Sequence, residues 1–275
     1  MNSIAVFIAL SFLVSCNPKT VEKSSTGAIN SNAPYKWTSA FPKTIRISEQ
    51  FNGPEADAIV SMGEEWSAAV NDKRTFFAFG ADVSEKTNNL TDLDNLYDNV
   101  MAVYKSGNWP DSLPGSALAV TQIFGRRYNV GDSEEFVAIE HADIILNNDF
   151  YSFDTADTGP GFDFRTVILH EMGHFLGLQH NNSGRNSTVM YPAIDPTESK
   201  RTPRTADISD LADKYSITLG GATTMSAPRP DRYKIKNNDP GRPVKILLEL
   251  HVSGDCIHKM DGVEFERHQS TLSSK

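Results

Sequence analysis

Apolar residues in the first part of the chain recur with two different periods. In residues 54–72 the large apolar side chains are three to four apart, as on the buried face of a helix: Ile59, Met62, Trp66 and Val70. Four other stretches have the alternation or the short apolar runs typical of strands: residues 44–48, 75–79, 99–104 and 136–146. The pattern therefore predicts a sheet with helices packed on it.

Two further helices are predicted in the second half of the chain. The first covers residues 164–178, with Asp163 and Thr166 as candidate N-caps. The second covers residues 205–215, where apolar side chains again lie three and four apart: Ile208, Leu211 and Tyr215. Each helix has an apolar side, which predicts burial against the rest of the domain.

The N-terminus has the features of a targeting segment. Residues 4–14 form an apolar run with one serine, which is too short to span a bilayer. Residues 13–16 read Leu-Val-Ser-Cys and resemble the bacterial lipobox, which implies cleavage before Cys16 and a lipid anchor on that cysteine. By resemblance to Gram-negative lipoproteins, Asn17 favours export to the outer membrane, on its periplasmic side or at the cell surface. No Lys or Arg precedes the apolar run, which weakens the prediction of a signal peptide. An ordinary secretory signal is the alternative, although a cleavage site of the Ala-x-Ala type is missing.

Composition divides the chain into four parts. Residues 1–15 are the predicted signal peptide, and residues 16–34, rich in Ser, Thr, Asn and Lys, are a lipid-anchored flexible tether. Residues 35–219 hold the predicted domain. Residues 220–275 contain four prolines and one predicted strand, at 244–252, and are too few for an independent core. We expect this extension, of unknown role, to pack on the domain or to be partly disordered.

Composition and charge narrow the range of partners. The chain has 275 residues, of which 39% are hydrophobic, and its net charge is −9. No basic footprint for nucleic acid is present, so we expect none as a partner, and we expect a monomer. The two cysteines are Cys16 and Cys256. If Cys16 carries a lipid, Cys256 is unpaired; otherwise the two could form a disulfide.

One stretch carries a candidate metal site: residues 170–180 read His-Glu-Met-Gly-His-Phe-Leu-Gly-Leu-Gln-His. On a helix, His170 and His174 share a face because they are four residues apart. Gly177 permits a left-handed turn, after which His180 can return toward the other two rings. Three neutral imidazoles suit Zn²⁺ and leave a fourth position for water. The stretch therefore predicts one catalytic zinc ion.

The acidic residue beside these histidines predicts the reaction. Glu171 can take a proton from water and later give it to a leaving amine. A zinc ion with three protein ligands lowers the pKa of its water to about 7 and polarises a carbonyl. The predicted reaction is hydrolysis of a peptide bond without a covalent intermediate, so the predicted partner is a protein or peptide substrate.

The spacing in residues 170–180 resembles the metzincin signature His-Glu-x-x-His-x-x-Gly-x-x-His. Met190 resembles the methionine that metzincins place in a turn beneath the metal, and its Met-Tyr-Pro order is similar to that of matrixins. The resemblance implies an α+β fold of the metzincin type. Such a fold has a twisted, mostly parallel sheet with an antiparallel edge strand, packed on long helices, and a small C-terminal subdomain below the zinc cleft.

Two stretches resemble the parts of matrixins that bind the substrate. Residues 115–121 resemble the edge strand to which an extended peptide adds as a further strand, and an ordinary internal strand is the alternative. Residues 192–194 resemble the wall of the pocket for the side chain after the cut bond. The candidate substrate-binding residues are Ala117, Leu118, Ala119, Pro192, Ala193 and Ile194.

Other metal sites are not expected. His141 is the only histidine before His170, so the second, structural zinc of matrixins is not carried over. Several carboxylates could offer oxygens to Ca²⁺, but they lack the spacing of an EF-hand and solvated loops explain them better: Asp132, Asp143, Asp149, Asp154 and Asp157. Three residues of the extension match no zinc motif and are expected on the surface: His251, Cys256 and His258.

Two functions of different classes are consistent with the sequence. The first is a lipid-anchored or secreted zinc endopeptidase, and the second is a non-catalytic surface module that binds peptides or mediates adhesion. Glu171 favours the first, because a structural zinc needs no adjacent base and usually has four protein ligands. An aminopeptidase is a third interpretation, which would require a closed subsite for the substrate amine.

Latency is not expected from the sequence. Matrixins are often silenced by a propeptide cysteine at the metal, and no such segment is apparent before residue 35. We therefore expect an enzyme that is active once exported. Cys256 reaching the metal from the C-terminal side is the less favoured hypothesis.

Overall fold

The computed structural model of the chain describes residues 30, 33–70, 74–156, 161–182, 184–192, 194–196, 198–219, 233–252 and 256–268. The predicted signal peptide and Cys16 lie outside these residues, as do most of the predicted tether, Asp157 and Ala193. None of the helices in the described ranges combines the length and the apolar composition needed to cross a membrane.

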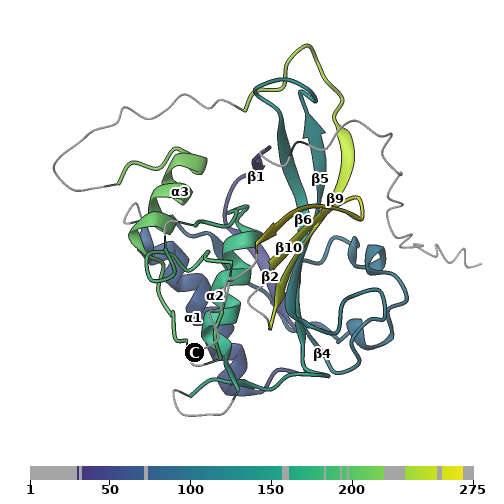
Figure 1. The fold of residues 1–275 in the computed structure, drawn as a ribbon, viewed down its shortest axis with the longest axis vertical. Helices are drawn as coiled ribbons and strands as arrows, with labels where there is room; N and C mark the ends of the chain where they lie inside the picture. The colour runs from purple at the N-terminus through teal and green to yellow at the C-terminus, as the bar shows by residue number, and fades with distance from the viewer. Residues whose placement is uncertain are drawn as a thin grey trace, which may run out of the picture.

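A nine-stranded mixed sheet organises the fold (Figure 1). Its strand order is β11-β10-β9-β5-β6-β4-β2-β3, and β1 pairs with β6. The strands are β1 (Tyr35–Trp37), β2 (Lys43–Ile47), β3 (Phe77–Phe79), β4 (Ala102–Ser106), β5 (Ala117–Tyr128), β6 (Phe136–Asn147), β9 (Arg242–His251), β10 (Cys256–Met260) and β11 (Val263–His268). Strands β1, β2, β3, β4 and β6 are parallel, whereas β5 and β9 to β11 are antiparallel to their neighbours. A separate pair consists of β7 (Phe153–Asp154) and β8 (Phe162–Asp163).

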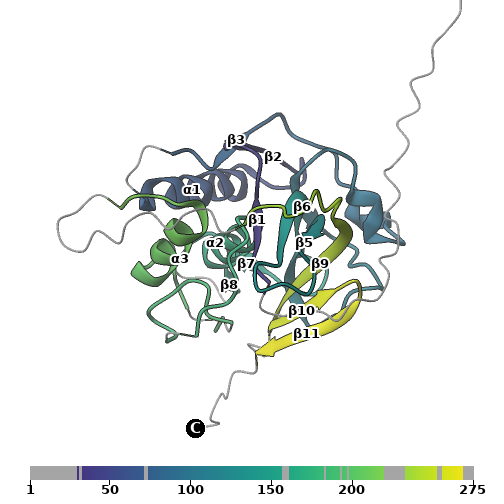
Figure 2. The same ribbon diagram turned by 90° about the horizontal axis from the view of Figure 1, so that it is seen from above.

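Three α-helices lie on one side of the sheet: α1 (Gly53–Ala69), α2 (Phe164–Phe175) and α3 (Thr205–Tyr215) (Figures 1 and 2). Helix α1 begins at a capping box, in which Asn52 and Glu55 each bond the other's backbone N–H, at 3.0 and 2.9 Å. The indole Nε1 of Trp66 donates to the carbonyl of Leu169 at 3.0 Å and ties α1 to α2.

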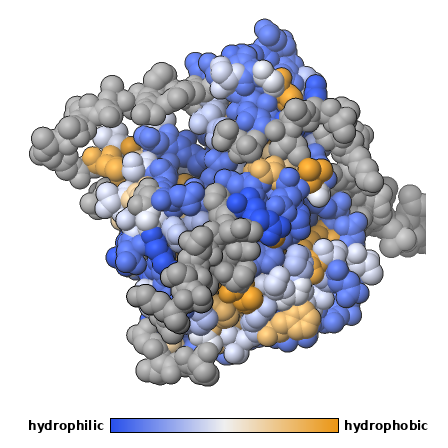
Figure 3. Space-filling view, viewed as in Figure 1, coloured by the Kyte–Doolittle hydropathy of each residue, from blue (hydrophilic) through white to orange (hydrophobic). Residues whose placement is uncertain are grey.

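The sheet has a hydrophobic core on each side. The larger core lies between the sheet and the helices and includes Trp66, Phe175 and Met190. The smaller core lies on the other face, beneath the 3₁₀ helices η1 (Thr87–Asn89) and η2 (Leu93–Leu96). On the face seen in Figure 3 the described residues are mostly hydrophilic, with small separate hydrophobic groups. The sheet is therefore covered on both faces, as suits strands that are apolar on both sides.

The predicted elements of residues 35–219 and the fold class are confirmed. The predicted helix at 54–72 is α1, and the predicted helices at 164–178 and 205–215 are α2 and α3. The four predicted strands correspond to β2, β3, β4 and β6, with ends that differ by up to three residues. The sheet is mixed, its strands from β6 to β3 are parallel, and an antiparallel strand, β11, forms one edge.

The prediction that residues 115–121 form an edge strand able to bind the substrate is wrong. They begin β5, an internal strand that pairs with β6 on one side and with β9 on the other. Ala117, Leu118 and Ala119 are fully buried there. The physical reason is that β9, a strand of the C-terminal extension, pairs with the side of β5 that would otherwise be exposed.

The C-terminal extension contributes strands to the sheet between Arg242 and His268. We expected one strand at 244–252, and the structure has three, β9 to β11. Alternate residues of β9 enter the larger core: Val244, Ile246, Leu248 and Leu250. The expectation that His251, Cys256 and His258 lie on the surface is wrong, since their exposed fractions are 4%, 0% and 0%.

Candidate metal centre

The candidate site is built on helix α2, which is buried along nearly its whole length. Asp163 caps the helix by accepting hydrogen bonds from the backbone N–H groups of Arg165 and Thr166, at 3.0 and 3.4 Å. Arg201 Nε pairs with the same carboxylate at 2.8 Å. Every residue from Thr166 to Phe175 is buried, so the helix holds its polar side chains away from water.

The chain turns at Gly177 to bring the third histidine back. Gly177 has φ +82°, and a Cβ there would lie 2.3 Å from the carbonyl oxygen of Tyr35. Only glycine meets both demands, the left-handed backbone and the close approach. Beyond the turn, the ring of His180 lies 4.9 Å from that of His174 and 5.5 Å from that of His170. The structure thus brings together the three predicted ligand side chains.

Backbone carbonyls orient two of the rings. His170 Nδ1 lies 2.8 Å from the carbonyl oxygen of Val189, and His174 Nδ1 lies 2.9 Å from that of Leu178. Because a carbonyl only accepts, each Nδ1 carries the proton and each Nε2 keeps its lone pair. Within the described residues, the buried Nε2 of His170 has no hydrogen-bond partner. Neutral imidazoles with lone pairs directed at one point fit a bound metal ion.

Burial keeps His170 neutral. It lowers the pKa of His170 to about 4, and the hydrogen bond to Val189 opposes this only in part. A neutral ring is the form that binds a metal.

Glu171 is a fully buried carboxyl group beside these rings. Its Oε2 accepts a hydrogen bond from Thr121 Oγ1 at 2.5 Å, while its Oε1 has no hydrogen-bond partner within the described residues. Burial raises the pKa of Glu171 to about 8, and the hydrogen bond from Thr121 lowers it in part. Such a carboxyl can both take up and release a proton near neutral pH. Sequence analysis missed Thr121, although it lies at the end of the stretch compared with a substrate-binding strand.

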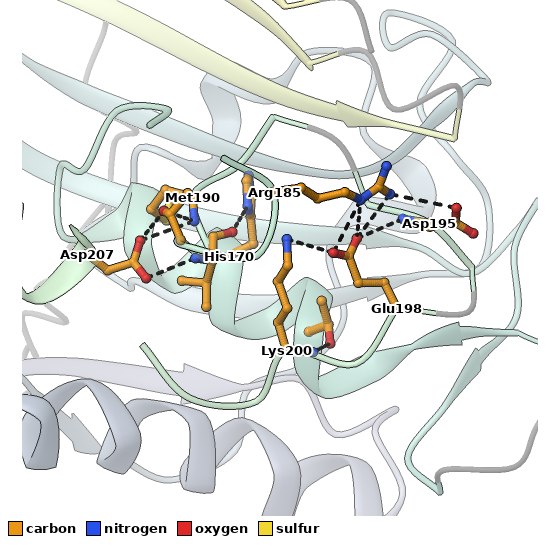
Figure 4. Close-up of polar contacts among 10 residues, drawn as sticks. His170, Arg185, Met190, Asp195, Glu198, Lys200 and Asp207 are labelled. Carbon is orange, nitrogen blue, oxygen red and sulfur yellow. Dashed lines mark hydrogen bonds and ion pairs between the residues drawn. The ribbon is translucent and has the colours of Figure 1, made fainter. Parts of the chain in front are cut away.

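Met190 lies in the predicted turn beneath helix α2. It is 1% exposed, and its Sδ is so close to Gly173 that a Cβ there would lie 2.3 Å away. Buried Asp207 of α3 fixes the turn, because it accepts from the backbone N–H of Val189 at 2.9 Å and bonds the hydroxyl of Thr188 (Figure 4). The carbonyl of Val189 in turn orients His170, so α3 supports the metal site through this turn.

A charged cluster borders the same turn. Glu198 pairs with Lys200 at 2.8 Å and with Arg185 at 3.1 Å, and Arg185 also reaches Asp195 at 3.8 Å (Figure 4). The positive charge of Lys200 contributes to the lowered pKa of His170. Sequence analysis did not single out this cluster, because its members have no common spacing.

A fourth metal-binding group comes from strand β10. The sulfur of Cys256 and one nitrogen from each of His170, His174 and His180 all lie within 4.8 Å of one another. The thiol is fully buried, and burial raises its pKa well above the usual range. The ring of His258, two residues on, lies 4.4 Å from that of His180. From the sequence, Cys256 at the metal is the less favoured hypothesis, and His258 is expected on the surface.

The remaining candidate residues are placed as follows. Pro192 and Ile194 are buried after the methionine turn, and their role as a pocket wall stays a prediction. Four of the candidate calcium carboxylates are engaged elsewhere: Asp132 with Lys236, Asp143 with His141, Asp149 with Trp109 and Asp154 with Ala156. Among the described residues, the group formed by the three histidines and Cys256 is the one His, Cys, Asp and Glu cluster with metal-binding geometry.

The fold and the three-histidine site define the class of protein as metzincin-like. In comparisons with known proteins, the model of the peptidase M10 family, described as matrixin, matches residues 132–216, about a third of the chain. Metalloendoproteinase 1 of Glycine max is 39% identical over 56 residues, which are 20% of this chain and 18% of that protein. Residues 132–216 are thus similar to matrixins, and the partial match to the Glycine max protein supports the same resemblance. Strand β5 and the strands β9 to β11, with Cys256, lie outside the matched residues.

Proposed function

We propose that this protein is a zinc-dependent endopeptidase. The observation that carries the proposal is the fully buried Glu171 beside three converging imidazoles, with one carboxylate oxygen that no described residue bonds. Burying a carboxyl group that makes one hydrogen bond lowers the stability of the fold. A purely structural metal site does not need such a group beside its ligands. The matrixin match supports the same class of activity.

In the proposed mechanism, each residue has a separate task. His170, His174 and His180 would hold Zn²⁺, which when bound supplies Lewis-acid polarisation of the scissile carbonyl and of water. Glu171 takes a proton from the attacking water at its free Oε1 and delivers it to the leaving amine. Thr121 holds the other oxygen, Oε2, and so fixes the direction in which Oε1 points.

The test is hydrolysis of a denatured protein, with and without a zinc chelator. Measured in chains that also carry Cys256→Ser, Glu171→Gln should lower kcat by about 10²- to 10⁴-fold, the usual contribution of general acid–base catalysis. Glu64→Gln, at an exposed position on α1, is the matched control and should retain the activity of the parent chain. If the parent chain is as inactive as Glu171→Gln under every condition, including after removal of the Cys256 thiol, the proposal is wrong.

The alternative function is a non-catalytic surface module with a structural zinc. One observation favours it: Cys256 completes a set of four donors, and closed four-ligand sites are typical of structural zinc. Glu171 argues against it, because a structural site needs no adjacent base. The two functions differ in whether Cys256 can leave the metal.

We also propose export and attachment to the outer membrane through Cys16, which rests on the lipobox resemblance alone. The test is incorporation of labelled palmitate during expression in a Gram-negative host. We expect label in the parent chain and none in Cys16→Ser. Label that is absent from both chains, together with release of the protein into the medium, would favour the secretory alternative.

A further inference from the structure

A three-stranded unit formed by β9, β10 and β11 covers the candidate metal centre from the C-terminal side. Strand β9 pairs with β5 from Arg127–Arg242 to Ala117–His251, and β10 pairs with β9 from Cys256–Leu250 to Met260–Ile246. Cys256 is the first residue of β10, so this strand begins beside the histidines of α2. The position of Cys256 is thus set by two backbone ladders and not by a loose tail.

The donor set at the centre fits a four-coordinate zinc ion. Zinc–nitrogen and zinc–sulfur bonds of about 2.0 and 2.3 Å place tetrahedral ligand atoms about 3.3 to 3.5 Å apart. The four donor atoms lie within 4.8 Å of one another, so small side-chain shifts would close the site on an ion. Binding of Zn²⁺ to Cys256 would release the thiol proton to solvent and leave a thiolate that offsets part of the metal's charge.

Side chains around Cys256 hold β10 over the histidines. The ring of His258 lies 4.4 Å from that of His180, tilted by 35°, and the ring of Phe265 of β11 lies 5.6 Å from that of His258. His258 Nδ1 also lies 2.9 Å from a carboxylate oxygen of Glu266. At the base of the unit, Lys259 pairs with buried Glu249. These contacts would keep the thiol at the metal without a disulfide.

The same unit removes the strand edge beside the proposed base. Thr121, which bonds Glu171, lies opposite Leu248 of β9, and Leu248 lies opposite His258 of β10. With β6 on its other side, β5 has no free backbone edge at this point. An extended peptide could not add to β5 as a further strand while β9 is in place.

Cys256 lies among the three histidines, and β9 pairs with the edge of β5 beside Glu171. From these two observations we propose that Cys256 is the fourth ligand of the zinc ion, and that strands β9 to β11 form a C-terminal inhibitory unit that keeps the endopeptidase latent. The unit fills the coordination position that water needs, and it occupies the edge of β5 nearest Glu171. The inference rests on the proposed function, since a chain with no latent activity has nothing to inhibit. It replaces our expectation of an enzyme that is active without a further step.

Cobalt substitution of the full-length chain tests the ligand directly. Metal-free protein is loaded with Co²⁺, and we expect a thiolate-to-cobalt charge-transfer band together with the weaker ligand-field bands. The charge-transfer band should be lost in Cys256→Ser and Cys256→Ala, while the ligand-field bands persist. Cys16→Ser is the matched control, because it removes the other cysteine of the chain and should retain the band. Ligand-field bands without a charge-transfer band in the parent chain would overturn the proposal.

Thiol protection gives a second readout that needs no activity. In Cys16→Ser, Cys256 is the one remaining thiol, and its rate of alkylation by iodoacetamide is compared in zinc-loaded and metal-free protein. We expect zinc to slow alkylation strongly, because the thiolate is then bound to the metal. Equal rates in the two forms would show that burial alone protects the thiol and would overturn the ligand assignment.

Latency is tested by peptide hydrolysis in the zinc-loaded chains. We expect a gain in kcat/KM in Cys256→Ser and Cys256→Ala over the parent chain, limited in size because β9 still covers the edge of β5, and loss of that gain when Glu171→Gln is added. A thiolate band with no gain of activity in either variant would overturn the inhibitory role and support the structural-zinc alternative. Failure of every chain to bind Co²⁺ or Zn²⁺ would instead contradict the proposed function itself.

Discussion

Thr121 of strand β5 donates a hydrogen bond to Glu171 Oε2 at 2.5 Å, and both side chains are fully buried. The bond joins the sheet to helix α2 at the point where the proposed chemistry takes place. It occupies one carboxylate oxygen, so the other is the one available to a substrate or water. Thr121 is therefore a positioning residue for the proposed base.

We expect Thr121→Val to lower kcat with little change in KM. Valine has nearly the same shape, but it removes a hydrogen bond to an ionisable group, which typically contributes about 1.5–3 kcal/mol, or roughly 10- to 100-fold in rate. The measurement is peptide hydrolysis by chains that also carry Cys256→Ser. Thr121→Ser keeps the hydroxyl and should restore most of kcat. Equal kcat in the valine and serine variants would contradict the positioning role.

The sequence predicts the local half of this site well. Three imidazoles and Glu171 lie within eleven residues, so helix geometry and one glycine turn are enough to bring them together. Helix α1 can be predicted equally well, because the buried side chains of Ile59, Met62 and Trp66 recur at helical spacing. Both inferences use contacts between residues close in sequence.

The sequence could not predict the half that depends on strand pairing. Cys256 reaches α2 only because β9 pairs with β5 and β10 pairs with β9, and no spacing rule connects a single cysteine to distant histidines. A partial signal was present in β5, where residues on both faces of the strand are apolar or small from Ala117 to Val120. Burial of both faces favours an internal strand over an exposed edge.

We expect Gly173→Ala to destabilise the protein. A Cβ at this position would lie 2.3 Å from Met190 Sδ and 3.0 Å from a ring carbon of Trp66. Such overpacking typically costs about 1–3 kcal/mol, more than the helix propensity of alanine returns. The measurement is the free energy of unfolding in urea. Gly53→Ala, where no atom lies within 4 Å of the added carbon, should be close to neutral, and an equal effect of both variants would refute the steric explanation.

We expect Asp207→Asn to weaken metal binding although Asp207 does not reach the metal. Its carboxylate holds the backbone N–H of Val189, whose carbonyl orients His170, and it also caps α3 through Arg204 N at 2.7 Å. Loss of an indirect support of this kind typically lowers metal affinity about 10- to 100-fold. The measurement is the zinc dissociation constant by competition with a chelator.

A conservative change on the same helix separates this effect from general damage to α3. Asp213→Asn removes a carboxylate that is exposed on α3, so zinc affinity should be unchanged. If both variants lose affinity equally, the link through Val189 is not the cause.

The metal-free protein should lose stability as the pH rises through neutrality. Burial raises the pKa of Glu171 from 4.5 to about 8, so the folded state holds a proton that the unfolded state has released. The stabilisation is complete below pH 4.5 and is lost as the pH approaches 8. Between pH 6.5 and 8 the expected loss from this group is about 2 kcal/mol, at about 1.4 kcal/mol per pH unit.

This pH window separates Glu171 from His170. Burial lowers the pKa of His170 from 6.5 to about 4, so its destabilising effect appears only as the pH falls below 6.5. Urea unfolding of the metal-free chain at several pH values between 6.5 and 8 is the measurement. Glu171→Gln cannot ionise and should flatten the profile, whereas Glu64→Gln should keep the slope of the parent chain, because Glu64 is exposed. A slope in Glu171→Gln as steep as that of the parent chain would mean that another group releases the proton.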